Sequence, residues 1–239
     1  MAIDSYLFTA SGGRAYNEDS VGERDFKNGK LFVLADGLGG HKYGDIASKC
    51  VVDTMKSAAE PEDEVQQWLE ENILKAHEAV MTLQEEKGAK MRSTVTALAL
   101  KENKAYWAHV GDSRLYYIHK NEISSITEDH SVAYKKYLSG EITREQIAFD
   151  EDQSSLLRAI GNESRNAPDF NCSEDELEPG DAFFLCSDGA WEYLKDNEIL
   201  FDYFKSENAL HWARYLLERI VSRVKEGNDN LSLITVMID

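Results

Sequence analysis

Three segments of the chain repeat apolar residues at the three- and four-residue spacing of an amphipathic helix. The clearest stripe consists of Val65, Leu69, Ile73, Ala76, Val80 and Leu83. An earlier helix is expected from about Lys42 to Ala59, before Pro61, and a later one over residues 210–224, before Gly227. The pattern therefore predicts two helices early in the chain and a single one near its end.

Apolar and β-branched runs come in pairs joined at Asn or Gly, which is typical of β-hairpins. The expected strand pairs are 19–26 with 30–35, 94–100 with 104–110, and 114–119 with 123–126, and further strands are expected from Ala182 and over 231–238. Consecutive hairpins indicate antiparallel sheet, because parallel strands need long crossovers. With the helices set apart from the strands, the order favours an α+β fold over a doubly wound parallel one.

Residues 131–155 show neither the 3.6-residue period of a helix nor the two-residue period of a strand, although the segment carries aromatic and aliphatic side chains. We interpret this segment as a mobile surface element. The chain contains no linker-like stretch rich in Pro, Ser or Gly, so residues 1–239 are expected to form one domain.

Composition and charge exclude several classes of protein. With 239 residues, 42% of them hydrophobic, the chain can bury a core. A formal net charge of −18 argues against binding to a nucleic-acid backbone. No apolar run approaches the roughly 18 residues of a membrane helix, and three widely spaced cysteines do not suggest a disulfide framework. We expect a soluble, cytoplasmic protein with no nucleic-acid or membrane partner.

Carboxylates at the ends of predicted strands are the candidate chemistry. Two strongly apolar strands end in Asp-Gly, at Asp36-Gly37 and Asp188-Gly189. Further candidate acidic residues are Glu18, Asp19, Asp112 and Asp229. Each alone could be an ordinary turn. Together, convergent carboxylates need cations to offset their repulsion, and oxygen-only ligands suit Mg²⁺ or Mn²⁺. The sequence has no zinc or EF-hand spacing.

Seven motifs in a fixed order give the chain a family resemblance. They are Arg14-Ala15-Tyr16-Asn17-Glu18-Asp19, Ala35-Asp36-Gly37-Leu38-Gly39-Gly40-His41, Val110-Gly111-Asp112-Ser113-Arg114, Asp129-His130-Ser131, Leu157-Arg158-Ala159-Ile160-Gly161, Cys186-Ser187-Asp188-Gly189 and Asp229-Asn230-Leu231-Ser232. The set resembles the metal-dependent serine/threonine protein phosphatases of type 2C, particularly the compact bacterial ones. It spans essentially the whole chain.

The resemblance implies an α/β/β/α sandwich, in which two stacked antiparallel β-sheets are flanked by helix pairs. Residues 131–155 correspond in position to the flap that helps set substrate preference in this family. The expected activity is hydrolysis of phosphoserine and phosphothreonine in signalling proteins. The expected partners are phosphoprotein substrates, such as a serine/threonine kinase or its targets.

The same resemblance assigns metal ligands by position. Asp36 would bridge two Mg²⁺ or Mn²⁺ ions, the Gly37 carbonyl would bind one of them, and Asp188 and Asp229 would complete the shell of the other. Asp112, with Asp188, matches a weaker third-metal position.

Two further roles follow from the resemblance. Glu18 and Asp19 would hold metal-bound waters, and Arg14 would grip the substrate phosphate. Water bridging the two ions would attack phosphorus in line, with no phosphoenzyme intermediate. The planar Arg14 guanidinium would stabilise charge on the phosphate oxygens.

The motifs assign no general acid, the group that would protonate the leaving serine or threonine oxygen. Some relatives carry a His directly after the Asp-Gly pair, and this chain has Leu38 there. His41 lies three residues on, and we do not assign the acid role to it. A metal-bound water is the alternative proton donor.

Other classes of phosphatase and hydrolase lack their characteristic motifs in this sequence. The loops of cysteine phosphatases, P-loop enzymes and Gly-x-Ser-x-Gly hydrolases are absent from the sequence. A catalytically silent, phosphoprotein-binding module remains the main alternative, and a small phosphomonoester remains an alternative substrate. The presence of Arg14, Asp36, Asp188 and Asp229 favours the active enzyme, because a silent relative would tolerate their loss.

Overall fold

The computed structural model of the chain describes residues 2–38, 43–61, 64–163, 168–173 and 175–239. In chain order its elements are β1 (Ile3–Ala10), β2 (Ser20–Phe26), β3 (Gly29–Ala35), β4 (Gly37–Leu38), α1 (Gly44–Ser57), α2 (Val65–Lys87), β5 (Arg92–Ser93), β6 (Val95–Lys101), β7 (Lys104–Val110), β8 (Arg114–His119), β9 (Glu122–Ile126), α3 (Val132–Leu138), the 3₁₀ helix η1 (Arg144–Phe149), β10 (Asp169–Cys172), β11 (Ala182–Cys186), α4 (Asp188–Trp191), α5 (Asp196–Phe204), α6 (Ala209–Arg223) and β12 (Leu231–Ile238).

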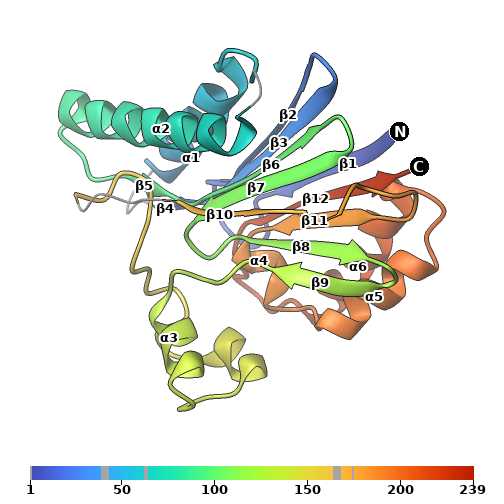
Figure 1. Cartoon of the computed structure of the whole chain (residues 1–239). Helices are drawn as coiled ribbons and strands as arrows, with labels where there is room; N and C mark the ends of the chain where they lie inside the picture. The colour runs from blue at the N-terminus through green and yellow to red at the C-terminus, as the bar shows by residue number, and fades with distance from the viewer. Residues whose placement is uncertain (1, 39–42, 62–63, 164–167, 174) are drawn as a thin grey trace.

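The long strands form two five-stranded sheets that lie face to face (Figure 1). One sheet has the order β1-β12-β11-β8-β9 and the other β10-β7-β6-β3-β2, with every pairing antiparallel. A short pair, β4 with β5, lies beside them. The predicted α+β architecture with two stacked antiparallel sheets is confirmed.

Strand β3 shows why the chain forms layers. Its Leu31 and Val33 pack with residues of α1 and α2, whereas Phe32 and Leu34 pack against the opposite sheet. All four are fully buried. Because successive side chains of a strand point to opposite faces, a strand apolar at every position fits a sheet covered on both sides.

A second pair of helices, α5 and α6, covers the outer face of the other sheet. There the Phe184 ring lies 5.6 Å from that of Tyr116 and 5.9 Å from that of Trp212 on α6. The prediction of a single late helix was therefore wrong. Helix α5 has only nine residues and is rich in Phe and Tyr, so it shows too little of the helical period to be recognised.

The three predicted hairpins are present, within a residue or two of the expected bounds. Their turns use backbone conformations with positive φ at Asn28 (61°), Glu102 (56°), Lys120 (49°) and Asn121 (68°). Asn adopts this region more readily than most residues, which is why Asn-containing turns marked the hairpins.

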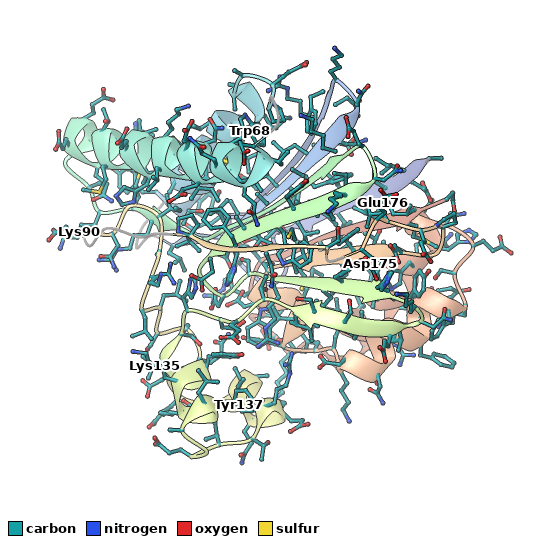
Figure 2. All side chains as sticks on the ribbon, in the orientation of Figure 1. Trp68, Lys90, Lys135, Tyr137, Asp175 and Glu176 are labelled. Atoms are coloured by element: carbon teal, nitrogen blue, oxygen red, sulfur yellow. The ribbon has the colours of Figure 1, made fainter. Side chains whose placement is uncertain are left out.

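The segment 131–155, which shows no period in the sequence, contains two short helices, α3 and η1. Ser131 caps α3 by accepting a hydrogen bond from the Tyr134 amide at 3.2 Å, and η1 follows six residues after α3. Both pieces are too short for a 3.6-residue period to be visible in the sequence. They project from the end of the sandwich, where Figure 2 labels Lys135 and Tyr137.

Helix α2 is the longest described helix, with 23 residues. Within the described part of the chain, no helix combines the length and the apolar composition needed to cross a bilayer.

Candidate metal centre

All the predicted acidic site residues lie at one edge of the sandwich. They are Glu18 and Asp19 before β2, Asp36 after β3, Asp112 between β7 and β8, Asp188 after β11, and Asp229 before β12. Because neighbouring strands are antiparallel, the end of one lies beside the start of the next. The topology therefore gathers these six acidic residues at one place, with contributions from both sheets.

Asp36, Asp112 and Asp188 are neighbouring carboxyls whose charges act on one another. Burial raises the pKa of each, and the charge of Asp188 raises the pKa of both Asp36 and Asp112 further. The side chains of Asp36 and Asp188 are within hydrogen-bond distance of each other. Three carboxyls held this closely repel one another when ionised, so the site favours either protons or cations.

Asp19 lies beside this group and is 6% exposed. Burial raises its pKa to about 7, assisted by the charges of Asp188 and Asp229 and opposed by hydrogen bonds from Ser232 and Ser187. Its Oδ2 accepts from the Ser187 hydroxyl at 2.9 Å, whereas its buried Oδ1 has no hydrogen-bond partner. A buried carboxylate oxygen without a donor is costly unless a ligand or ion satisfies it.

Glu18 is held at the mouth of the centre. Its amide donates to Asn230 Oδ1 at 2.8 Å, and its Oε1 accepts from the Gly44 amide at 3.3 Å. Burial also raises the pKa of Glu18. The side chain therefore occupies the N-terminal end of α1, where the helix dipole favours negative charge.

Close backbone contact explains the glycines of the two Asp-Gly steps. A Cβ on Gly37 would lie 2.1 Å from the Gly44 carbonyl oxygen, and one on Gly189 would lie 2.0 Å from the Asn230 carbonyl oxygen. Neither glycine has a positive φ. These glycines therefore permit dense packing behind the carboxylates, and no special turn is involved.

Arg14 and Asp229 bind each other in the structure. Arg14 Nε donates to Oδ1 at 3.2 Å and Arg14 Nη2 donates to Oδ2 at 2.9 Å, which makes the contact bidentate. The resemblance assigned these residues to different partners, a phosphate and a metal ion. Arg14 is the cation next to a cluster of carboxylates, so pairing with the most exposed of them is electrostatically favourable.

Replacing Arg14 with Lys is expected to leave thermal stability almost unchanged while lowering turnover of a phosphopeptide by about tenfold or more. The pair is exposed, with side-chain exposures of 56% and 45%, and exposed pairs contribute only about 0–1 kcal/mol to stability. Lys keeps the charge but loses bidentate contact with phosphate. Thermal melts and initial rates check this, and a large fall in melting temperature with normal turnover would contradict it.

Several residues that position the carboxylates were not predicted as functional. Asn230 bonds the Ser11 and Tyr16 carbonyls at 2.9 and 2.8 Å and thereby ties the Arg14 loop to β12. Thr94 accepts from the Asp36 amide at 2.9 Å and donates its own amide to the Asp36 carbonyl at 2.8 Å. Asn230 belongs to one of the seven motifs, although no role was assigned to it, and nothing in the sequence marks Thr94.

A second group, His109, His130 and Asp169, places one donor atom each within 4.8 Å of the others. The Gly111 amide donates to His130 Nδ1 at 3.0 Å, so the ring proton is on Nε2, which faces Asp169 Oδ2 at 2.8 Å. A metal could bind Nε2 only if that proton left. We therefore assign His130 to holding Gly111, next to Asp112, rather than to a metal site.

The carboxylate centre fits divalent cations chemically. Its donors are all oxygens, five of its carboxyls have raised pKa values, and Asp19 has an unpartnered buried oxygen. Hard cations with octahedral preference suit such donors. Among the described residues, only the histidine group gathers three donors within 4.8 Å. No three of the described carboxylates therefore bring one oxygen each within 4.8 Å of the others, although Asp36 and Asp188 lie close together. His41 lies outside the described residues.

Comparisons with known proteins agree on one family. A family model described as "Protein phosphatase 2C" matches residues 11–215. A putative protein phosphatase 2C-type of Streptococcus pyogenes serotype M6 is 34% identical over 194 residues, covering 78% of each chain.

Two solved structures have the same fold as this chain. The serine/threonine phosphatase of S. agalactiae superposes with a TM-score of 0.88 at 26% identity and full coverage of both chains. The catalytic domain of the serine threonine protein phosphatase PstP, in complex with two manganese ions, gives 0.85 at 27% identity with 99% of both chains covered.

Proposed function

Since this chain belongs to the protein phosphatase 2C family, we propose that it hydrolyses phosphoserine and phosphothreonine in proteins with the help of two divalent metal ions. The observation that supports this most directly is the convergence of six carboxylates from both sheets beside Arg14, in a chain that resembles a manganese-bound phosphatase.

The proposed metal ligands are Asp36, the Gly37 carbonyl, Asp188 and Asp229. Asp36 lies at the centre of the group, next to Asp188, which suits a residue shared by two ions. Glu18 and Asp19 would hold water at the edges of the site, and the unpartnered Oδ1 of Asp19 is available to accept from it. Asp112 is the proposed ligand of a third, weaker ion. Mg²⁺ and Mn²⁺ are both compatible with these donors.

When bound, the ions would act as Lewis acids that lower the pKa of bridging water, with no phosphoenzyme intermediate. The chain's own part is to orient and to stabilise. Arg14 would leave Asp229 and donate two parallel hydrogen bonds to the phosphate. Its fixed positive charge would stabilise the negative charge that builds up on the phosphate oxygens.

We further propose that the chain is one catalytic domain in which residues 131–155 act as a flap. Gln153 of this segment donates to Asp188 Oδ2 at 3.5 Å, so the segment reaches the centre itself. Widely spaced free cysteines are compatible with a reducing, cytoplasmic location. Phosphoprotein substrates are the proposed partners, and a serine/threonine kinase or its targets would supply them.

The test is phosphate release from a phosphothreonine peptide with Mn²⁺, with Mg²⁺ and with EDTA. Turnover is expected with metal and is expected to vanish in EDTA, because no side chain of the centre can by itself generate hydroxide at neutral pH. Restoration of activity by adding excess Mn²⁺ back controls for irreversible damage. Metal-independent turnover would contradict the proposal, and peptide binding without turnover would indicate a silent module.

A further inference from the structure

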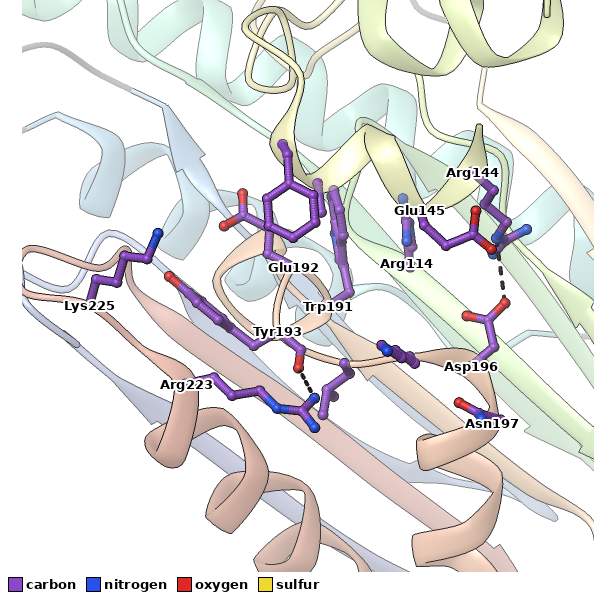
Figure 3. A pocket seen from close by; sticks show the side chains of 14 residues that line it. Arg114, Arg144, Glu145, Trp191, Glu192, Tyr193, Asp196, Asn197, Arg223 and Lys225 are labelled. Carbon is purple, nitrogen blue, oxygen red and sulfur yellow. Dashed lines mark hydrogen bonds and ion pairs between the residues drawn. The ribbon is translucent and has the colours of Figure 1, made fainter. Parts of the chain in front are cut away.

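A cavity of about 930 Å³ lies beside the metal centre, between η1 and residues 191–197 (Figure 3). Its apolar lining includes Phe149 and Trp191. Phe149 is 84% exposed, the highest value among the large apolar side chains in the described ranges. A Phe left this open on the rim of a cavity offers a surface for an apolar group of a ligand.

The cavity differs from the rest of the molecule in charge. Five cationic and three acidic side chains line it, although the chain as a whole carries −18. Arg144 pairs with Asp196 at 3.4 Å, Arg223 with Glu198 at 2.6 Å and Arg114 with Asp129 at 2.6 Å.

Two of the cations are free to meet a ligand. Neither Lys195 nor Lys225 has an ion-pair partner within 4 Å among the residues that the structure describes, and both are exposed. Glu145 and Glu192 line the same cavity, also without an ion pair of their own to any described residue, and the charge of Lys195 contributes to lowering the pKa of Glu145. The lining as a whole still holds two more cationic than acidic side chains, on a chain whose net charge is −18. An acidic ligand is the occupant that this charge complements.

The cavity and the metal centre share a wall. Trp191 lines the cavity and donates its indole N–H to the Asp112 carbonyl at 2.9 Å. The Arg114 guanidinium stacks on the Trp191 ring at 3.6 Å and is itself fixed by Asp129. Glu192, the next residue, lies one helical turn after Asp188 and donates its amide to the Asp188 carbonyl at 3.1 Å. The cavity therefore adjoins the metal centre.

We propose that the cavity binds the stretch of substrate protein next to the phosphorylated residue and selects acidic stretches with an apolar side chain. The apolar side chain would pack on Phe149 and Trp191, and the acidic ones would lie beside Lys195 and Lys225. The proposal rests on the proposed phosphatase function and names the class of substrate that this function prefers.

The experiment compares two phosphothreonine peptides of equal length. One has Asp and Glu with a single Phe next to the phosphothreonine, and the other has Asn, Gln and Ala at the same places. The variants are Lys195→Glu with Lys225→Glu, and Phe149→Ala. The matched control is Lys27→Glu with Lys104→Glu, which makes the same charge change in two exposed hairpin turns at the opposite end of the second sheet. p-Nitrophenyl phosphate, which has no flanking chain, reports on the metal centre alone.

The wild type is expected to turn over the acidic peptide with a kcat/KM at least about tenfold above that of the neutral peptide. The double lysine variant should lose this preference, Phe149→Ala should reduce it, and the control should keep it. All four proteins should hydrolyse p-nitrophenyl phosphate at similar rates. An unchanged preference in both variants would overturn the docking site. Failure of the wild type on p-nitrophenyl phosphate and on both peptides would instead overturn the phosphatase function.

Discussion

The Asp36→Asn variant is expected to lose metal-dependent turnover by about a thousandfold or more and, without metal, to unfold at a higher temperature than the wild type. The two effects have one cause. Asp36 is buried among Asp19, Asp188 and Asp112, and burial together with their charges raises its pKa well above the ordinary value. Removing this carboxylate relieves repulsion in the free protein and removes the proposed shared metal ligand.

Phosphate release with Mn²⁺ and thermal melts in EDTA measure the two effects on the same preparations. Asp25→Asn is the control, because Asp25 has a side-chain exposure of 85% and lies at the far end of β2. This control should change neither property. Preserved turnover in Asp36→Asn would remove Asp36 from the mechanism, and a lower melting temperature in EDTA would show that Asp36 stabilises the fold.

The melting temperature in EDTA is expected to fall by about 2 °C or more between pH 6.5 and pH 8.5. Burial raises the pKa of Asp19 to about 7 and that of Glu192 to about 8. A carboxyl with a raised pKa in the folded state binds more protons there than in the unfolded chain, so stability decreases as pH rises through the folded pKa.

Histidines act in the opposite direction at lower pH. Burial lowers the pKa of His77, of His109 and, to about 4, of His130, so their neutral folded forms gain stability as pH rises toward about 6.5. Above about pH 6.5 the histidines no longer oppose the destabilising effect of the carboxyls, which is why the melting temperature is expected to fall there.

Saturating Mn²⁺ should abolish or reverse the fall in melting temperature between pH 6.5 and pH 8.5, since metal and protons compete for the same carboxylates. Asp19→Asn should flatten the curve in EDTA, whereas Asp25→Asn should not. Melts at half-unit pH steps, with and without Mn²⁺, provide the measurement. A melting temperature in EDTA that rises across pH 6.5–8.5 would show that these carboxyls are not held protonated in the folded protein.

The parts of the fold that were predictable from the sequence are those with strong local constraints. The three hairpins carry turn residues that suit positive φ, and α2 carries an apolar stripe over 23 residues. The sequence also placed Asp36 and Asp188 at the ends of apolar strands, whereas the expectation that they share one site rested on the family resemblance.

The remainder depends on contacts between distant parts of the chain. Strand β1 is half-buried at almost every position, so it shows no clear alternation, and it is defined by pairing with β12. Helix α5 and the two short helices within 131–155 are too brief for periodicity. The Arg14–Asp229 pair joins residues 215 positions apart, and no local pattern predicts it.

The pairing of β1 with β12 has a consequence for how the protein is made. The first strand of the chain is an edge strand whose partner is the last strand, with Ile3 opposite Ile238. During synthesis on the ribosome, β1 emerges long before β12 and remains unpaired until β12 has been translated. Contacts of such long range are slow to form, and an unpaired strand is prone to intermolecular association. Because Asp229 lies just before β12, the carboxylate centre also cannot be assembled until this part of the chain has been made.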